Sequence, residues 1–282
     1  MSGAPSIRAA TLDDVPSIRG ILAAHGNDGP ILRYDVVGPY VRHLVVHHRV
    51  QVSAADGEIV AFGAIVDAGV AQHLADLFVR GDRLGQGIGR PLLTSLFGIA
   101  ADRTTFASDD RRALPLYVRA GMAPRWVCLY LAGASSAIPE PHGSIELETA
   151  DPVRLAALEQ AWTGVDRSVD HAYWGATPDV DAFVVAVNGA PVAIAYARAR
   201  QASSTRFVDR LVVRSGVDPV GPTLAALRRA GRGDVVEALL PGPSPVLRPL
   251  LDLGFLVTDR DQFMASGPDL LDPAMIPNPG ML

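Results

Sequence analysis

The segment RLGQGIGRPL, residues 83–92, places Gly85, Gly87 and Gly89 at every second position and Pro91 shortly after them. Glycines just before a helix leave the backbone without side chains. Consecutive N–H groups can then approach an anion at the positive end of the helix dipole. A phosphate or pyrophosphate group fits such a turn. The segment therefore predicts an anion-binding loop at the start of a helix.

Two common nucleotide-binding motifs do not account for this loop. A dinucleotide fingerprint needs G-x-G-x-x-G directly after a strand, with an acidic residue about 20 positions further on, and Asp109 lies near that distance. However, Arg90 stands where the third glycine is required, and RGDRL separates the preceding strand from the loop. A phosphate-binding P-loop needs Gly-Lys-Ser/Thr, and the sequence has no lysine.

Asp76 is a candidate general base. It lies within the apolar segment AQHLADLFV, where burial would raise the pKa of its carboxyl group. His73 is the other candidate, but the two-residue period of a strand predicts that its side chain faces away from that of Asp76. At most one of them would then face a site. Asp76 could instead bond only to neighbouring backbone or to an arginine, and a chain of water molecules could carry the proton.

The histidines do not indicate a metal site. His43 and His47 lie four residues apart on one helical face, a spacing that can bind zinc. The glutamate of an H-E-x-x-H motif is missing and no third ligand is evident. We therefore expect no metal.

Composition excludes several classes of protein. The chain has 282 residues, of which 49% are hydrophobic, and a net charge of −5 from 25 basic and 30 acidic residues. Basic residues form no cluster longer than RRAGR at 228–232, so nucleic acid is not an expected partner. The most apolar segment is interrupted by Asp67, Asp76 and glycines, which indicates buried strands rather than a membrane helix.

Cysteine and arginine usage indicate the cellular setting. Cys128 is the single cysteine, so no internal disulfide can form, and no charged-then-apolar leader is present. These features predict a cytoplasmic location. All the basic residues are arginines, which together with abundant alanine, glycine and proline favours a GC-rich bacterial source.

The sequence contains an internal repeat. Three pairs of segments align at separations of 132, 134 and 133 residues: 56–66 with 188–198, 77–80 with 211–214, and 114–132 with 247–265. The small, proline-bearing segment between the copies has the composition of a linker. We therefore predict two similar domains, 1–132 and 144–282, joined by a linker at 133–143.

Each half alternates strand and helix signals. In the first half we expect helices near 15–26, 37–48, 90–103 and 110–121, and strands near 5–11, 49–66, 71–79, 104–108 and 125–132. This order predicts an α/β fold, of the α+β mixed-sheet type.

Two segments of the first half, LFVRGDRLGQGIGRPLL and DRRALPLYVRAGM, resemble the acetyl-coenzyme A signature of the GNAT superfamily of N-acetyltransferases. In that family a strand leads to Arg/Gln-x-x-Gly-x-Gly/Ala and a helix whose amides hold the coenzyme pyrophosphate. Gly87 and Gly89 match the family glycines. A later helix matches through Ala113, Leu116, Tyr117, Gly121 and Met122.

One position departs from the family pattern. Leu84 stands where the family has Arg or Gln, and Arg80 and Arg83 are the alternatives for the missing charge. The resemblance implies acetyl-coenzyme A as co-substrate and no metal. It also implies a coenzyme-binding set comprising Phe78, Val79, Leu84, Gly85, Gln86, Gly87, Ile88, Gly89 and Arg90.

The resemblance further implies transfer of an acetyl group to a primary amine, which we expect to belong to a small molecule. Tyr117 would donate a proton to the departing thiolate, and a backbone N–H near Phe78 or Val79 would meet the developing oxyanion. Asp76 is the candidate base. A core tyrosine at helical spacing is the alternative for Tyr117. We expect the chain to be a monomer or a homodimer.

The second half keeps the pattern of the fold but loses the loop. Gly221 aligns with Gly87, but Pro222 and Thr223 replace the next two residues, and proline has no N–H to donate. Tyr117 aligns with Leu250. We interpret the chain as a tandem GNAT protein with a degenerate second domain, although that domain could bind a second coenzyme through other contacts. The alternatives for the whole chain are a non-catalytic acyl-coenzyme A binding or sensing protein and a purely structural interaction protein.

Overall fold

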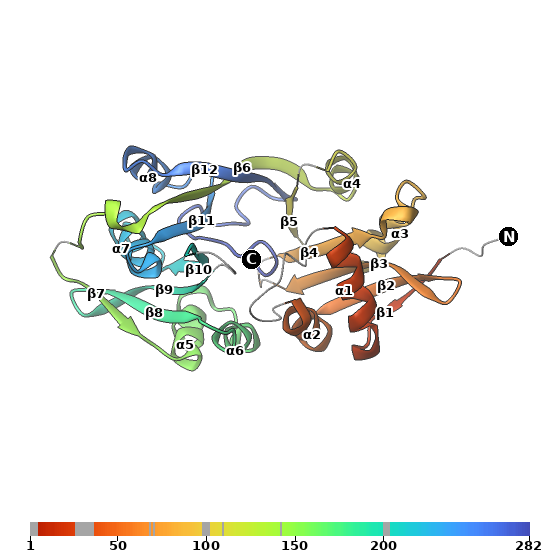
Figure 1. Ribbon diagram of the computed structural model, residues 1–282, viewed down its shortest axis with the longest axis horizontal. Helices are drawn as coiled ribbons and strands as arrows, with labels where there is room; N and C mark the ends of the chain where they lie inside the picture. The colour runs from red at the N-terminus through yellow and green to blue at the C-terminus, as the bar shows by residue number, and fades with distance from the viewer. Residues whose placement is uncertain are drawn as a thin grey trace. The chain divides into compact units, whose positions relative to one another are not determined.

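The computed structural model describes residues 5–25, 37–67, 69, 71–97, 102–108, 110–141, 143–199 and 204–282 (Figure 1). The chain forms two compact units, which we treat one at a time. The first unit comprises Met1–Pro124, Met264–Leu270 and Pro279–Leu282, and the second comprises Arg125–Phe263 and Leu271–Asn278. Among the described residues, no helix has the length and apolar character needed to cross a membrane.

The first unit is built on a mixed sheet. Its strand order is β1 (Ser6–Ala9), β2 (Arg49–Ala55), β3 (Glu58–Asp67), β4 (Gln72–Val79) and β5 (Arg103–Ala107). Neighbouring strands from β1 to β4 are antiparallel, and β4 and β5 are parallel. The predicted α/β class is confirmed.

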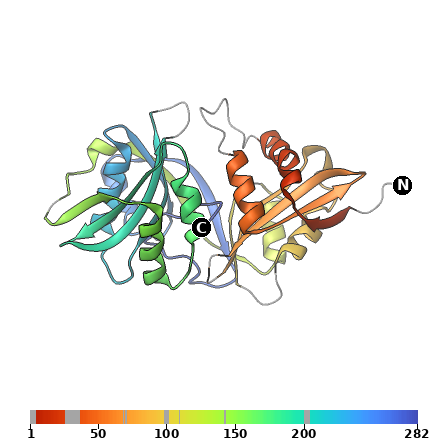
Figure 2. The same cartoon turned by 90° about the horizontal axis from the view of Figure 1, so that it is seen from below.

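Helices cover both faces of this sheet (Figure 2). On one face α1 (Val15–Ala24) and α2 (Val37–His47) pack their apolar side chains against Val52, Phe62 and Val66. On the other face α3 (Gly89–Leu96) and α4 (Ala113–Arg119) pack against Ala61, Ile65 and Leu74. Apolar residues therefore alternate between the two faces along β3, as a strand buried on both faces requires.

A capping box precedes α1. The carboxylate of Asp14 accepts hydrogen bonds from the Thr11 amide (2.8 Å) and the Thr11 hydroxyl (3.1 Å). It also accepts two bonds of 2.7 Å from the Arg8 guanidinium. The Arg8 contact, followed by the Thr11 contacts, lowers the pKa of Asp14 to about 2. Because this pKa lies below that of the unfolded chain, the box stabilises the fold above about pH 4 and loses its effect as the pH falls toward about 2.

We predict that Asp14→Asn lowers the free energy of unfolding by about 1 to 2 kcal/mol near neutral pH, because it weakens these bonds. Urea unfolding measures the loss, which should shrink as the pH is lowered through the acid range. Asp13→Asn is the matched control, since Asp13 is exposed. A loss that does not change with pH would contradict the assignment to the Asp14 carboxylate.

The second unit repeats the architecture. Its strand order is β12 (Leu256–Ala265), β6 (Ala123–Ala134), β11 (Val235–Pro241), β10 (Arg206–Val213), β9 (Ala190–Ala199), β8 (Asp181–Val187) and β7 (Ile145–Thr149). Its helices are α5 (Pro152–Thr163), α6 (Ser168–Gly175), α7 (Val220–Gly231) and α8 (Leu247–Asp252). The order of helices and strands from β7 to β12 matches that from β1 to β6, as the internal repeat predicts.

The compact units do not coincide with the predicted ranges 1–132 and 144–282. Strand β6 pairs antiparallel with β11 within the second unit. Within the first unit, the Ser266 amide donates to the Arg103 carbonyl (2.9 Å), and the Arg103 amide donates to the Ser266 hydroxyl (2.9 Å). Each half of the sequence thus contributes its closing segment to the unit formed mainly by the other half. Local sequence patterns cannot show such an exchange, because it depends on long-range pairing.

The segment predicted as a linker, 133–143, is packed into the second unit along much of its length. Ile138 is 1% exposed and belongs to the apolar core of that unit. The Arg228 guanidinium of α7 donates to the Ile138 carbonyl and forms an ion pair with Glu140. These contacts distinguish the segment from a flexible spacer.

Candidate functional site

The glycine loop joins β4 to α3 through a short 3-10 helix, Gly81–Arg83. Gly85 and Gly87 have φ angles of +77° and +79°, which residues with a Cβ atom rarely adopt. A Cβ atom at either position would meet nothing within 4 Å. Backbone conformation, rather than crowding, therefore requires glycine at both positions, and the space beside them is open.

The backbone amides of this loop are not used by the protein. Within the described residues, the amides of residues 85–90 donate no hydrogen bond. On either side, the Leu84 amide donates to the Gly81 carbonyl (3.4 Å) and the Leu92 amide to the Ile88 carbonyl (3.5 Å). Six consecutive N–H groups thus stand at the positive end of α3, where an anion would satisfy them.

The side chains of the loop add little charge. Gln86 donates to the Asp82 carbonyl (3.3 Å), Ile88 is buried, and the Leu84 side chain is half-buried. The Arg90 side chain is exposed. The loop therefore offers backbone donors, with Arg90 as its only cationic side chain between residues 84 and 90.

The two arginines that precede the loop are engaged with carboxylates. The Arg80 guanidinium lies 2.7 Å from both Asp82 and Glu58. The Arg83 guanidinium lies 3.9 Å from Asp56 and 3.7 Å from Asp82. Neither arginine therefore presents an uncompensated charge in place of the one that Leu84 lacks.

Strands β4 and β5 separate beside the loop. Their parallel register pairs Gln72–Leu74 with Arg103–Thr105 and ends there, although β4 continues to Val79. Beyond Leu74, β4 is paired only with β3 among the described strands. The edge of β4 next to the glycine loop is therefore open to an extended ligand.

The register with β3 determines which amides face this opening. The Arg80 amide donates to the Val60 carbonyl (2.8 Å), so Val79 and its partner Ala61 form a non-hydrogen-bonded pair. The amide of Val79 consequently points away from β3. The amide of Phe78, one residue earlier, points toward β3, which corrects the expectation that Phe78 could donate to an oxyanion.

Strand β4 carries a β-bulge at Ala75. Asp76 lies opposite Ala64 and Leu74 lies opposite Ile65, so Ala75 has no partner in β3. An inserted residue of this kind reverses the alternation of side chains along the strand. The two-residue period therefore does not hold across Ala75.

Because of this bulge, His73 and Asp76 lie on the same face of the sheet. His73 is paired with Val66 and Asp76 with Ala64, and both partners belong to the core formed with α1 and α2. The prediction that the two side chains lie on opposite faces is wrong. It failed because the sequence gives no signal for the bulge.

His73 serves a structural role. It is fully buried, and its Nε2–H donates to the Pro279 carbonyl (2.8 Å). The other ring nitrogen, Nδ1, lies 3.0 Å from the Thr104 hydroxyl, with which it forms a hydrogen bond. Both nitrogens are engaged, so His73 is not available as a base.

Asp76 has the properties of a proton acceptor. Its Oδ2 accepts a hydrogen bond of 2.9 Å from the Tyr40 hydroxyl in α2. Burial raises the pKa of Asp76 to about 6, and the Tyr40 hydrogen bond partly opposes this rise. The carboxyl group therefore exchanges protons near neutral pH. Tyr40 was not identified from the sequence, since helical periodicity alone does not show which strand residue a helix side chain meets.

Tyr117 lies in α4 and is 7% exposed. Burial raises the pKa of its hydroxyl well above the usual range, and the charges of Asp76 and Asp110 raise it further. Among the described residues, none forms a hydrogen bond with this hydroxyl. The phenol is thus protonated at neutral pH, and it lies close enough to Asp76 for the two groups to interact electrostatically.

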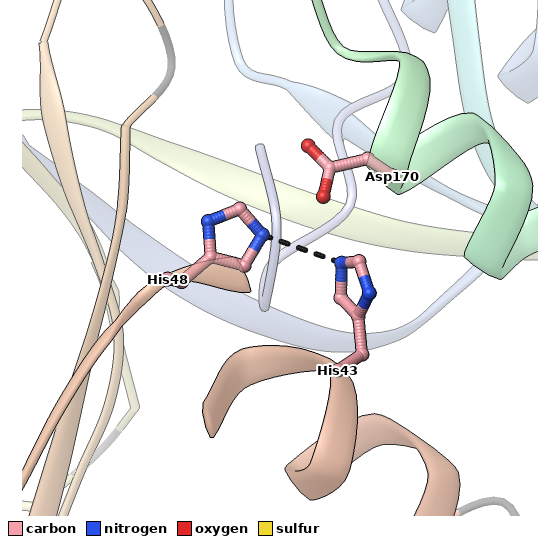
Figure 3. A group of neighbouring side chains, drawn as sticks. All are labelled: His43, His48 and Asp170. Atoms are coloured by element: carbon pink, nitrogen blue, oxygen red, sulfur yellow. Dashed lines mark hydrogen bonds between the residues drawn. The ribbon is translucent and has the colours of Figure 1, made fainter. Parts of the chain in front are cut away.

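His43 of α2 pairs with His48, which directly follows that helix, rather than at the helical spacing considered for zinc (Figure 3). The Nε2 atoms of His43 and His48 lie 3.3 Å apart in a hydrogen bond. The rings of His43 and His47 have centroids 5.0 Å apart. Asp170, drawn in the same view, belongs to the second unit. The expectation that the chain uses no metal stays a prediction.

The second unit fills the position of the glycine loop differently. The Val220 amide at the start of α7 donates to the Asp218 carboxylate (3.1 Å), and Pro222 supplies no N–H. A carboxylate of the chain itself thus occupies this helix terminus. Its negative charge would repel a phosphate group.

The second unit also lacks the equivalent of Asp76. Strand β10 has the same bulge at Asp209, and the residue that follows it is Arg210. Arg210 is buried and donates to Glu159 (2.5 Å), whose other oxygen lies 3.0 Å from the His171 Nε2 atom. A buried ion pair thus replaces the carboxyl group found in the first unit.

A mixed sheet that opens beside a loop of unbonded amides is the arrangement expected of a GNAT domain. Residues 31–122 match the family described as Acetyltransferase (GNAT) family, which is a third of the chain. This part of the chain is a GNAT acetyltransferase domain. Comparison with curated protein sequences gives no match.

Solved structures extend the likeness to the whole chain. A Pyrococcus horikoshii protein assigned provisionally as an acetyltransferase aligns with a TM-score of 0.71 at 15% identity, over 99% of this chain and 94% of that one. A tandem GNAT protein from the clavulanic acid biosynthesis pathway aligns at 0.61 and 13%, over 95% and 100%. A GCN5-related N-acetyltransferase from Sphaerobacter thermophilus aligns at 0.59 and 17%, over 93% and 95%. At these identities the comparisons show a shared fold, which includes that of a tandem GNAT protein.

Proposed function

We propose that the first unit is an acetyl-coenzyme A-dependent N-acetyltransferase that acetylates a primary amine of a small molecule. The observation that carries this proposal is the run of unbonded amides at residues 85–90, at the start of α3. These donors fit a pyrophosphate group without help from a lysine, which the chain lacks. When bound, the coenzyme supplies an acetyl thioester.

Binding uses the backbone more than the side chains. The unbonded amides of residues 85–90 would hold the pyrophosphate, and the open space beside Gly85 and Gly87 admits it. The free edge of β4 offers the Val79 amide to the extended arm of the coenzyme. Because β4 has no strand partner there, the ligand can complete the hydrogen bonding of the sheet.

The side chains around this edge have properties suited to amide formation. Asp76 accepts a proton from the ammonium form of the substrate, and the neutral amine nitrogen then bonds to the thioester carbon. The Val79 N–H donates to the thioester oxygen as negative charge develops on it. The carbon–sulfur bond breaks, and Tyr117 donates its proton to the departing sulfur. A raised pKa keeps the Tyr117 proton in place until then. The nitrogen, which still carries two protons after the attack, releases one of them to solvent to give the amide, and Tyr117 regains a proton from solvent.

The proposal also includes the cellular location, the partners and the oligomeric state of the protein. We include no nucleic acid or membrane among the partners, in keeping with the net charge of −5. The single cysteine, Cys128, is buried and unpaired, which suits a cytoplasmic protein. We propose a monomer or homodimer in which the second unit binds no coenzyme.

An assay of free thiol with a panel of small amines tests the function. We expect amine-dependent thiol release, with one equivalent of N-acetylated product detected by mass spectrometry. A sensing protein would instead give heat on titration with acetyl-coenzyme A but no amine-dependent thiol. An interaction protein would give neither heat nor thiol. Either of these results would contradict the proposed enzyme.

The pH dependence tests the base. Because Asp76 must be ionised to accept a proton and its pKa is about 6, kcat should fall roughly tenfold per pH unit below about pH 6. Asp76→Asn should lower kcat by about 100-fold or more near neutral pH and abolish this acid limb. Asp67→Asn, an exposed site in β3, is the matched control. An acid limb that persists in Asp76→Asn would assign the proton to another acceptor, such as water.

A further inference from the structure

The Tyr40 hydroxyl lies between two acceptors of the first unit. Its oxygen is 2.9 Å from Asp76 Oδ2 and 3.4 Å from the Gly280 carbonyl oxygen. A hydroxyl group has a single proton to donate, and a carbonyl can only accept. The shorter distance shows that the proton is directed mainly at Asp76, with Gly280 as the second acceptor.

The segment that supplies the Gly280 carbonyl is held in place. Residues 279–282 belong to the first unit, although they follow the second unit in sequence. The buried His73 donates to the Pro279 carbonyl (2.8 Å), one residue before Gly280. Met281 and Leu282 are 1% and 5% exposed. The second acceptor of Tyr40 is therefore anchored on both sides.

The two oxygens of Asp76 differ in their surroundings. Oδ2 accepts from Tyr40, whereas Oδ1 receives no hydrogen bond from the described residues. A hydrogen bond to one oxygen of a carboxylate fixes the orientation of the group and therefore the direction in which the other oxygen points. Oδ1 is thus the oxygen available to a substrate.

We propose that Tyr40, steadied by the Gly280 carbonyl, is a positioning residue that fixes Asp76 through Oδ2 and leaves Oδ1 to take the proton of the amine. The inference rests on the proposed function, in which Asp76 is the proton acceptor. The proton moves from the ammonium nitrogen to Oδ1, and Tyr40 keeps its own proton. As the charge on the carboxyl group disappears, the Tyr40 proton is shared more with Gly280.

No charged group competes with Tyr40 for Asp76 among the described residues. The ionisable side chains on the packed elements include His73 on β4, Glu58 and Asp67 on β3, Arg42, His43 and His47 on α2, Arg19 and His25 on or next to α1, and Tyr117 on α4. None of them forms a hydrogen bond or ion pair with Asp76. His73 has both nitrogens engaged, and the His25 Nε2 atom donates to the Val79 carbonyl (2.8 Å). The Tyr40 hydroxyl is therefore the polar group that stabilises the charged form of Asp76.

Tyr40→Phe tests the proposal, because it removes the hydroxyl and keeps the packed ring. Loss of a hydrogen bond to the charged form raises the pKa of a carboxyl group. The acid limb of kcat should therefore move up by about one pH unit. We expect kcat to fall several-fold near the limb and to approach the wild-type value at higher pH. The dissociation constant for coenzyme A should not change.

A second readout does not depend on activity. Titration of the Asp76 carboxyl carbon by NMR, with Asp76→Asn used to assign the signal, should show the same upward shift in Tyr40→Phe. The matched control is Tyr130→Phe in the second unit, where the Tyr130 hydroxyl donates to Asp261 Oδ2 (3.0 Å). This variant should leave both the limb and the Asp76 titration unchanged.

The outcomes separate the two proposals. An Asp76 titration that does not move in Tyr40→Phe, or a kcat that falls equally at all pH values, overturns the role of Tyr40 while wild-type turnover still supports the enzyme. Wild-type protein with no amine-dependent thiol release overturns the proposed function and the positioning role with it.

Discussion

Gly87→Pro should raise the dissociation constant for coenzyme A by about 100-fold or more. Proline removes the Gly87 N–H, and its fixed φ near −65° replaces the observed +79°, so the neighbouring amides also turn away from the pyrophosphate. Hydrogen bonds to a charged group contribute about 1.5 to 3 kcal/mol each, so loss of one or two accounts for a change of this size. Isothermal titration calorimetry measures the affinity directly.

A matched pair of variants separates loop conformation from general strain. Gly87→Ala keeps the N–H but disfavours the positive φ, and we expect it to weaken binding by about tenfold. Gly57, at the turn between β2 and β3, has a φ of +81°, and like Gly87 it has nothing within 4 Å of a Cβ atom. Gly57→Ala should therefore cost similar stability without changing affinity. Wild-type affinity in Gly87→Pro would show that the coenzyme binds elsewhere.

Tyr117→Phe should lower kcat by about 100- to 10,000-fold and leave coenzyme affinity within about twofold of wild type. The Tyr117 hydroxyl is the group that can protonate the departing sulfur. Phenylalanine lacks this hydroxyl but keeps the buried ring, which packs in the apolar core of the first unit. Steady-state kinetics with thiol detection gives kcat, and calorimetry gives the affinity.

The pH profile adds a check on this role. A proton donor must be protonated, and the pKa of Tyr117 is raised well above its usual range, so wild-type activity should show no loss from Tyr117 ionisation through mildly alkaline pH. Tyr130→Phe is a suitable control, since it removes a half-buried tyrosine hydroxyl from the second unit. If Tyr117→Phe keeps nearly full kcat, the tyrosine belongs to the core only, and the thiolate leaves without a donor from α4.

The sequence predicted the local features of the first unit. Gly85 and Gly87 indicated a loop before a helix, and both have the positive φ angles that only glycine adopts readily. The apolar segment around Asp76 indicated a buried strand, and burial is the main cause of its raised pKa. These properties depend on residues close together in the chain, which is why the sequence could reveal them.

The features that the sequence did not predict depend on distant contacts. The bulge at Ala75 arises from pairing with β3, and it places His73 and Asp76 on one face. The contact between Tyr40 and Asp76 joins positions 36 residues apart, and the contact between Tyr40 and Gly280 joins positions 240 apart. Residue types and periodicity do not specify such pairings, since they require the sheet and helices to be assembled.

Because closing segments are exchanged, each half of the sequence needs the other half to fold. Cleavage within 133–143 would separate the chain of β6 from β11, its hydrogen-bonded neighbour, and would separate Arg103 from Ser266. Each fragment would then carry a bare row of backbone donors and acceptors, which invites aggregation. A chain whose second copy took no part in catalysis would therefore still need that copy to fold, because β6 pairs with β11 and Arg103 bonds to Ser266.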